Sequence, residues 1–421
     1  MINPSVSYDV CVIGAGWAGF NAALKAAKSG KKVCLIEEKD IGGTCLNRGC
    51  IPTKALARYS KQGLPFGEIQ KKKNEVVLRL LDGMLYHLKV NTIDFQQGRA
   101  VVGADGRVSV DGIPLETKFI LIAAGSLAAE LPDLKLDHNQ VLSSDDVLEF
   151  DRLPRSILIV GAGAIGCEFA SIFKKLGAQV TIVEIKSQLL PGFDIQTCKK
   201  LQQLFQKDGI KVILGKSFKD LNRSDYDKIF LCVGRRGFLE NTFEKGFSLT
   251  MDKGFIQVDD QLKTSLPHIF AVGDCIGGMM LAHVASYEGE LAVHNMFSEP
   301  KNRDYSCVPS SVFTAPEVAF IGLSENAIRD AKTPYSVQSA HYLAVGMAHI
   351  LEETEGFVKV MVDEKDRLIL GASIIGPQAT ELINVFSILM KNKIPIQGLK
   401  DTILAHPSVS EILGEVAKAF E

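Results

Sequence analysis

The apolar positions of this chain repeat one pattern in two separate segments. Residues 8–38 contain an apolar run at 10–13, a glycine-rich turn, a helical stretch and a second apolar run, and residues 155–185 follow the same order. Short continuous apolar runs bounded by glycine are typical of strands buried on both faces of a parallel sheet. The pattern therefore predicts two strand–turn–helix–strand units.

The two units share the spacing of three turn glycines and of one later carboxylate. In such a turn the first glycine allows a tight bend, the second lets the backbone approach a pyrophosphate, and the third lets the helix pack closely. Glu37 and Glu184 end the second strands, where a carboxylate accepts hydrogen bonds from a ribose diol and repels a 2′-phosphate. A single glycine turn also precedes helices that bind no nucleotide, but the duplication favours two dinucleotide sites, for FAD and NAD rather than NADP. The glycines are Gly14, Gly16 and Gly19 in the first turn and Gly161, Gly163 and Gly166 in the second.

The rest of the pattern predicts an α/β fold with two Rossmann-like dinucleotide-binding domains and a C-terminal α+β domain. Residues 98–110 have the pattern of short strands with a turn, a β-meander, whereas the corresponding stretch of the second unit, 216–226, is too short for one. From residue 308 onward, alternating strands precede two helices. The further predicted strands are 119–125, 228–234, 268–273, 356–362 and 368–375, and the predicted C-terminal helices are 380–391 and 408–420.

The composition excludes several classes of protein. The 421 residues include 47 Lys and Arg and 49 Asp and Glu, and the resulting net charge of −2 indicates no nucleic-acid-binding surface. The longest apolar runs are far shorter than the roughly 18 residues of a membrane helix. The first Lys is Lys25, after the glycine turn, so the N-terminus lacks the basic region of a signal peptide. We therefore expect a reducing, cytoplasmic setting and no membrane partner.

Two of the nine cysteines, Cys45 and Cys50, lie close together in a glycine-rich segment. On an ideal helix five positions rise about 7.5 Å, whereas a disulfide needs roughly 4.4 to 6.8 Å between Cα atoms. If the two cysteines bond, the segment is not a regular helix, and Gly42, Gly43 and Gly49 allow it to bend. The alternative is a pair of buried free thiols.

The other seven cysteines lie mostly in strand or helix patterns, and we expect them to fill the core. An odd number of cysteines in a long chain argues against a framework of structural disulfides, and no second close pair indicates zinc or another metal. These seven are Cys11, Cys34, Cys167, Cys198, Cys232, Cys275 and Cys307.

His406 and Glu411 are candidates for a proton-transferring pair. Pro407 biases His406 toward an extended backbone, and a helix that starts just after it brings Glu411 close to the imidazole. A carboxylate on one ring nitrogen raises the basicity of the other, as a general base requires. Ser408 and Glu411 also have the spacing of a capping box, in which Glu411 only satisfies backbone donors.

These motifs together resemble the pyridine nucleotide-disulphide oxidoreductase family, in the family's order and over nearly the whole chain. Within the family they are most similar to the dihydrolipoamide dehydrogenases. The resemblance implies an FAD-binding domain at 1–148, a shortened NAD-binding domain at 149–237, a return segment at 238–305 that completes the FAD domain, and an interface domain at 306–421. The motifs are the two glycine turns, Gly-Gly-Thr-Cys-Leu-Asn-Arg-Gly-Cys-Ile-Pro-Thr-Lys at 42–54, Ala-Val-Gly-Asp at 271–274, and His-Pro-Ser-Val-Ser-Glu at 406–411.

The resemblance also implies roles for individual side chains. Cys45 would be the interchange thiol that meets the lipoyl disulfide, and Cys50 the thiol against the flavin. Lys54 and Glu168 would form an ion pair near flavin N5, although by spacing alone each is an ordinary solvated helix charge. Asp274 would bind the ribityl chain of FAD, and the helix after it would direct its positive end at the flavin.

His406 and Glu411 would act on Cys45 of the partner subunit, so the implied active site requires a homodimer. The resemblance implies no metal. The implied FAD positions are Gly14, Gly16, Gly19, Glu37, Gly43, Thr44, Lys54, Gly125, Asp274, Ala282 and His283, and the implied NAD positions are Gly161, Gly163, Gly166, Glu184 and Gly234.

The implied activity is oxidation of dihydrolipoyl groups with NAD⁺, by exchange at Cys45 and Cys50 and hydride transfer through FAD. The partners would be lipoyl domains of 2-oxo acid dehydrogenase complexes or a glycine-cleavage carrier protein. One alternative is an NAD(P)H-dependent reductase of another disulfide, similar to glutathione reductases, although Ala164 replaces the tyrosine of those enzymes and no Arg follows Glu184. The other is a flavoprotein of low turnover that serves as a redox or scaffold subunit.

Three features depart from the pattern of the family. The stretch 216–226 is short, and the helix after Lys54 is interrupted at 63–67. Trp17 occupies a position in the first glycine turn where a small residue or proline is common, and the sequence provides no functional account of it.

Overall fold

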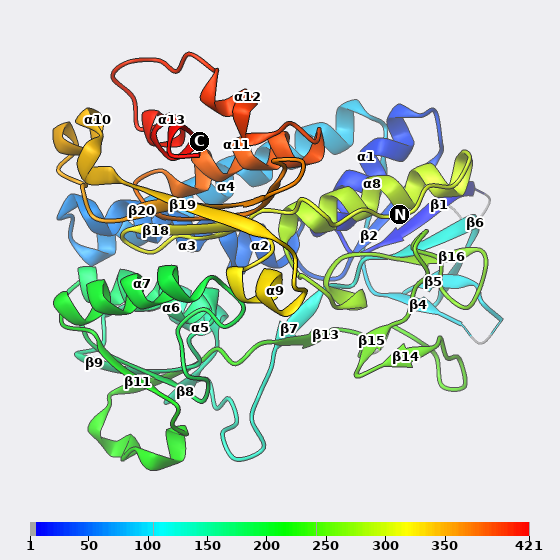
Figure 1. The fold of residues 1–421 in the computed structure, drawn as a ribbon. Helices are drawn as coiled ribbons and strands as arrows, with labels where there is room; N and C mark the ends of the chain where they lie inside the picture. Colours follow the sequence, from blue (N-terminus) through cyan, green and yellow to red (C-terminus); the bar gives the residue numbers. More distant parts are fainter. Residues whose placement is uncertain (1–5, 104, 241, 421) are drawn as a thin grey trace. The chain divides into compact units, whose positions relative to one another are not determined.

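The computed structural model describes residues 6–103, 105–240 and 242–420, which form two compact units (Figure 1). Unit 1 comprises Met1–Leu56, Gly67–Glu130 and Gly234–Arg303, and unit 2 comprises Ala57–Phe66, Leu131–Val233 and Asp304–Glu421. Each unit contains one of the two predicted strand–turn–helix–strand segments.

Unit 1 is built on a mixed sheet. Among its described residues the strand order is β3 (Asp94–Gln97), β2 (Val33–Glu37), β1 (Ser7–Ile13), β6 (Ile113–Ile122), β5 (Val108–Val110) and β4 (Ala100–Val102), and β16 (Ile269–Ala271) also pairs with β6. β1, β2, β3, β6 and β16 run parallel, whereas β4 and β5 form the antiparallel meander that the sequence predicts. Two small ribbons complete the unit: β7 (Ser126–Ala128) with β13 (Arg235–Gly237), and β14 (Met251–Asp252) with β15 (Phe255–Ile256).

The two faces of this sheet carry separate apolar cores. Val10 and Val12 of β1 pack into the core beneath the helices, and Cys11 between them packs into the core on the meander side. An added Cβ on Gly289 would lie 2.3 Å from the backbone oxygen of Ala18, so α1 and α8 cross at very close range. The helices that contribute to the helical core include α1 (Trp17–Lys28), α4 (Phe66–Val90) and α8 (Ala282–Phe297).

Two short helices, α2 (Gly43–Arg48) and α3 (Cys50–Tyr59), follow β2. A 3₁₀ turn at Ser60–Gln62 and Gly63, with a φ of +67°, separate α3 from α4. The predicted interruption at 63–67 is therefore confirmed.

The part of unit 2 that contains the second glycine turn has a parallel sheet. Among its described residues the order is β11 (Lys211–Leu214), β10 (Gln179–Glu184), β9 (Ser156–Val160), β12 (Lys228–Leu231) and β8 (Val141–Leu142). Two 3₁₀ turns, Phe218–Asp220 and Arg223–Asp225, occupy the stretch that corresponds to the meander of unit 1, which confirms that this part is shortened. The associated helices are α5 (Ser144–Leu148), α6 (Ala164–Lys175) and α7 (Ile195–Lys207).

The C-terminal part of unit 2 contains an antiparallel sheet, as the alternating pattern after residue 308 predicts. Its order is β17 (Ser310–Val312), β18 (Glu317–Gly322), β21 (Ile369–Gly376), β20 (Phe357–Asp363) and β19 (Tyr335–His341). The helices of this part are α9 (Glu325–Asp330), α10 (Gly346–Ile350), α11 (Ala379–Lys391), α12 (Ile396–Lys400) and α13 (Glu411–Lys418). Together the two units confirm the predicted fold class.

The predicted start of the last helix at residue 408 is wrong, because α13 begins at Glu411. The hydroxyl of Ser408 donates back to the backbone oxygen of Ala405 at 2.6 Å, and the helix begins only after Ser410, whose side chain makes no capping hydrogen bond. Local side-chain bonding of this kind competes with helical backbone geometry.

A buried ion cluster joins the two parts of unit 2. The Lys359 ammonium on β20 lies 2.8 Å from Asp194 and 2.7 Å from Glu325 of α9. Asp194 also caps α7 by accepting from the backbone N–H of Thr197 at 3.1 Å. Lys359 and Asp194 are almost completely buried, so one lysine connects the start of α7 to the antiparallel sheet.

Candidate active site

The first glycine turn presents bare backbone at the start of α1. Gly14 has a φ of +99°, and an added Cβ would lie 2.3 Å from the backbone oxygen of Ala123. An added Cβ on Gly19 would lie 1.9 Å from the oxygen of Gly14, so this glycine is required for close packing. Gly16 caps α1 without a side-chain bond, and the first turn carries no acidic residue. The free N–H groups and the helix dipole therefore suit an anionic pyrophosphate.

The second turn has the same construction at the start of α6. Gly161 has a φ of +109°, and an added Cβ would lie 2.5 Å from the backbone oxygen of Cys232. An added Cβ on Gly163 would meet nothing within 4 Å, which leaves open space beside the turn. Gly163 caps α6 without a side-chain bond, and Gly234, three residues after the end of β12, has a φ of +126°. This turn too fits a pyrophosphate.

The carboxylates of Glu37 and Glu184 bind their glycine turns in the same way. One oxygen of Glu37 accepts from the backbone N–H of Ala15 at 2.8 Å, and one oxygen of Glu184 accepts from Ala162 at 2.8 Å. The other oxygen of each accepts from the backbone two residues further on, again at 2.8 Å. Because a carboxylate has about four acceptor positions, each retains capacity for ribose hydroxyls.

The cysteine-bearing segment is not one regular helix. Cys45 lies within α2 and Cys50 begins α3, and between them Gly49 has φ −149° and ψ −114°. The two side chains are thiols in the structure, and a hydrogen bond joins them. The broken helix therefore brings both sulfurs together, although the sequence separates them by more than one helical turn.

The surroundings of Cys45 act on its charge in opposite directions. The pKa of Cys45 is raised well above its ordinary value, because the hydrogen bond with Cys50 and burial outweigh the hydrogen bond from Trp17 and the charge of Lys54, which lower it. Lys54 lies one turn after Cys50 on α3, and Glu168 lies on α6 in unit 2. Glu168 is buried and accepts from the backbone N–H of Phe313 at 3.0 Å.

Asp274 lies in a polar group that the sequence did not predict. Ser126 donates a hydrogen bond to Asp274, and Arg235 donates to the Ser126 hydroxyl at 2.7 Å while its Nε lies 3.8 Å from the Asp274 carboxylate. The only available signal was position, because Ser126 follows Gly125 and Arg235 follows Gly234. These contacts fix the direction of the Asp274 carboxylate.

Glu288 contacts the backbone next to Asp274, and further predicted FAD positions lie at the starts of helices. Glu288, which is buried on α8, accepts from the backbone N–H of Gly273 at 2.6 Å, a role that no sequence pattern indicated. Ala282 and His283 begin α8, whose first turn has neither a side-chain cap nor an acidic residue. Gly43 and Thr44 begin α2.

His406 and Glu411 form the predicted pair. Nδ1 of His406 lies 2.8 Å from one oxygen of Glu411, and the other oxygen accepts from the backbone N–H of Ser408 at 3.0 Å. The carboxylate thus orients the imidazole and satisfies a backbone donor at the same time. The hydrogen bond with His406 lowers the pKa of Glu411. The imidazole is exposed, which leaves Nε2 accessible to another group.

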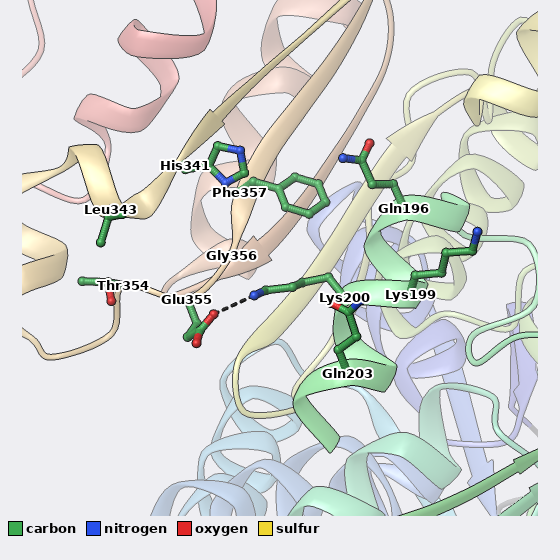
Figure 2. A pocket seen from close by; sticks show the side chains of 10 residues that line it. All are labelled: Gln196, Lys199, Lys200, Gln203, His341, Leu343, Thr354, Glu355, Gly356 and Phe357. Atoms are coloured by element: carbon green, nitrogen blue, oxygen red, sulfur yellow. Dashed lines mark hydrogen bonds and ion pairs between the residues drawn. The ribbon is translucent and has the colours of Figure 1, made fainter. Parts of the chain in front are cut away.

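Unit 2 also contains a cavity of about 550 Å³ that no motif predicted (Figure 2). Its walls come from α7, from His341 and Leu343, and from residues 354–357. Lys200 points across it to Glu355, at 2.6 Å, and Lys207 lies 3.0 Å from the other oxygen of the same carboxylate. The lining contains no cysteine and none of the predicted site residues.

Within the described ranges, no three or more His, Cys, Asp or Glu side chains cluster as metal ligands do. No helix in the described part of the chain combines the length and the apolar character needed to cross a membrane.

Residues 8–289 match the pyridine nucleotide-disulphide oxidoreductase family, and residues 308–417 match the dimerisation domain of the same family. The chain belongs to this family. A dihydrolipoyl dehydrogenase of Chlamydia trachomatis serovar D is 33% identical over 447 residues, which cover 98% of this chain and 96% of that protein. A dihydrolipoyl dehydrogenase of Bacillus subtilis strain 168 is 32% identical over 467 residues, with coverage of 99% and 98%.

Among solved structures, the HOCl-induced flavoprotein disulfide reductase RclA from Escherichia coli is similar to this chain. Its TM-score is 0.91 at 28% sequence identity, and the match covers 98% of this chain and 100% of that chain. The family confirms the predicted FAD-dependent oxidoreductase and the cofactors FAD and NAD, and the dimerisation domain supports the predicted homodimer.

Proposed function

We propose that this protein oxidises dihydrolipoyl groups to the disulfide with NAD⁺, which is the activity of a dihydrolipoyl dehydrogenase. The observation that carries the proposal is the contact between Cys45 and Cys50 across the break at Gly49. The similarity to named dihydrolipoyl dehydrogenases over nearly the full length of both chains supports it.

In this proposal the two cysteines exchange with the substrate dithiol. A dihydrolipoyl thiolate attacks the sulfur of Cys45, the bond between Cys45 and Cys50 breaks, and the second substrate thiol then displaces Cys45 from the mixed disulfide. The substrate leaves as a disulfide, and the cysteine pair holds the two electrons. When bound, FAD supplies the two-electron chemistry between this thiol pair and NAD⁺.

His406 accepts the proton of the attacking thiol in the proposed reaction. Glu411 fixes its tautomer through the bond at Nδ1, which leaves Nε2 as the basic nitrogen. We infer that it serves Cys45 of the other subunit of the homodimer. The same inference assigns Lys54 and Glu168 to an ion pair near the flavin.

The proposal also includes the cofactor positions. The first glycine turn, Glu37, Gly43, Thr44, Lys54, Gly125, Asp274, Ala282 and His283 would hold FAD, and the second turn with Glu184 and Gly234 would hold NAD. Domain limits at 148, 237 and 305, lipoyl domains of 2-oxo acid dehydrogenase complexes or of a glycine-cleavage carrier as partners, and a cytoplasmic setting belong to the same proposal.

The test is the initial rate of NADH formation by the purified, FAD-loaded protein with dihydrolipoamide and NAD⁺, and with NADP⁺ as the control. Rapid turnover with NAD⁺ alone is the expected result. Cys45→Ser is expected to retain FAD and to lose this activity. Full activity of that variant would overturn the assignment of Cys45.

A second candidate is a reductase that uses NADH to reduce another disulfide. The similarity to the disulfide reductase RclA favours it. NADH oxidation with a panel of disulfides, including lipoamide and glutathione disulfide, separates the two candidates. A low-turnover flavoprotein would show bound FAD and little activity in either direction.

A further inference from the structure

Trp17 is the only tryptophan of the chain and the first residue of α1. Its partly buried indole donates a hydrogen bond to the sulfur of Cys45. The side chain that the sequence left without a role therefore contacts one of the two proposed redox thiols.

Two backbone contacts determine how closely the start of α1 approaches the start of α2. The N–H of Gly42 donates to the oxygen of Ala15 at 2.8 Å, and an added Cβ on Gly43 would lie 2.8 Å from Cα of Gly16. The first residue of α1 follows Gly16, and the third residue of α2 is the cysteine. The contact between indole and thiol thus follows from the packing of the glycine turn against α2.

The chemistry of this hydrogen bond favours one state of the sulfur. An indole has a donor and no acceptor, so it can bind the lone pairs of a thiolate but cannot accept the proton of a thiol. A hydrogen bond to the charged form of a group stabilises that form. Among the described residues, the other titratable groups that act most on Cys45 are Cys50, which raises its pKa, and Lys54, whose charge lowers it; both lie on α3. In the proposed dimer, His406 of the partner subunit also faces Cys45.

We propose that Trp17 is a positioning residue for Cys45, whose indole N–H holds the sulfur in place and stabilises its thiolate in the reduced cysteine pair. The inference rests on the proposed exchange reaction at this pair. Reduction by a dithiol breaks the Cys45–Cys50 bond and transfers two electrons to the pair, while the dithiol becomes a disulfide. Of the two dithiol protons, one stays on the pair and one is released, so the pair retains one negative charge; Cys50 draws this charge away from Cys45, and the indole favours the part of it that resides on Cys45.

The first test compares Trp17→Phe with the wild type, both carrying His406→Gln so that the histidine does not titrate. The FAD-loaded protein is reduced with a phosphine, and the rate of alkylation of Cys45 by iodoacetamide is measured against pH by peptide mass spectrometry. Because iodoacetamide reacts with the thiolate, loss of the N–H donor is expected to raise the midpoint by about one pH unit. The rate well below both midpoints should fall about tenfold.

Cys50 in the same digests is the internal control, and its profile is expected to move less than that of Cys45. An unchanged Cys45 midpoint in Trp17→Phe would overturn the proposal. An equal shift of both cysteines would also overturn it, because such a shift indicates a general disturbance of the segment.

The second test leaves Trp17 in place. Its fluorescence, followed against pH in the reduced protein, is expected to show a step that is absent in Cys45→Ser and present in Cys50→Ser. A step that persists unchanged in Cys45→Ser would refute the contact. Neither test requires NAD⁺ or dihydrolipoamide, so a protein that fails to oxidise dihydrolipoamide contradicts the proposed function without deciding the role of Trp17.

Discussion

Replacement of Lys359 by methionine is expected to weaken unit 2 severely. The ammonium group lies 2.8 Å from Asp194 and 2.7 Å from Glu325, and the Lys359 side chain is only 3% exposed. Methionine occupies a similar volume but leaves the buried Asp194 carboxylate without its partner. Removal of one member of a buried ion pair costs about 3 to 5 kcal/mol, because the remaining charge stays buried and uncompensated.

Hydrogen exchange of peptides from α7 and β20 measures this loss, since it reports the free energy of local opening in each segment. A loss of about 3 kcal/mol corresponds to exchange at least about 100-fold faster. Lys365→Met is the matched control, because this lysine is exposed on the turn after β20 and its replacement is expected to cost less than about 0.5 kcal/mol.

The double variant with Asp194→Asn sharpens the test. Asparagine is a good helix cap and carries no charge, so it removes the buried carboxylate while it keeps the cap of α7. Stability is therefore expected to recover in part relative to Lys359→Met alone. Less than about tenfold faster exchange in Lys359→Met would refute the view that this cluster connects the two parts of unit 2.

Three further predictions concern packing, specificity and pH. Gly289→Ala is expected to lower the free energy of unfolding by about 1 to 3 kcal/mol and to lower the FAD content, because the new Cβ meets the Ala18 oxygen at 2.3 Å. Gly83→Ala is the control, because this glycine lies in open space within α4, and thermal unfolding should show it to be neutral or stabilising. Glu184→Gln removes the charge that we propose repels a 2′-phosphate, so the kcat/KM ratio of NADP⁺ to NAD⁺ should rise about tenfold, and an unchanged ratio would contradict this role. Burial alone would raise the pKa of Glu325, but the hydrogen bonds from Lys359 and Tyr335 outweigh burial and bring the pKa down to about 2. Because the folded pKa lies below the ordinary value of 4.5, the stabilisation is complete above pH 4.5 and should be lost as the pH falls toward 2, with a smaller acid loss in Glu325→Gln in chemical denaturation.

Features encoded by local spacing could be predicted from the sequence. The glycine turns depend on positive φ and close approach, which few residues other than glycine tolerate, and their spacing therefore identifies both turns. His406 and Glu411 are separated by five positions, so a short turn is enough to bring them together.

Contacts between distant segments could not be predicted in this way. Lys359 and Asp194 are 165 positions apart, and Ser126 and Asp274 are 148 positions apart. Neither pair has a periodicity or a spacing that marks it in a single sequence. The same limit applies to Trp17, whose partner becomes evident only when α2 packs against the glycine turn.

The two glycine turns resemble each other in more than their glycines. Each turn also binds the segment that follows its second strand. In unit 1 the peptide of Ala15 donates to Glu37 and its oxygen accepts from Gly42 at 2.8 Å. In unit 2 the peptide of Ala162 donates to Glu184, and its oxygen accepts from the backbone N–H of residue 190 at 2.8 Å. Each turn therefore holds both the carboxylate at the end of its second strand and the chain that follows.

Only in the first turn does this attached chain carry the cysteine pair. The segment held by Ala15 leads directly into α2 and Cys45, whereas the segment held by Ala162 leads through residues 190–194 into α7, which begins at residue 195 and has its one cysteine, Cys198, buried. The two glycine turns thus share one backbone arrangement, and they differ in the segment that each turn holds. For this reason the contact of Trp17 with Cys45 has no counterpart at Ala164, the corresponding position of the second turn, where the side chain is a single methyl group.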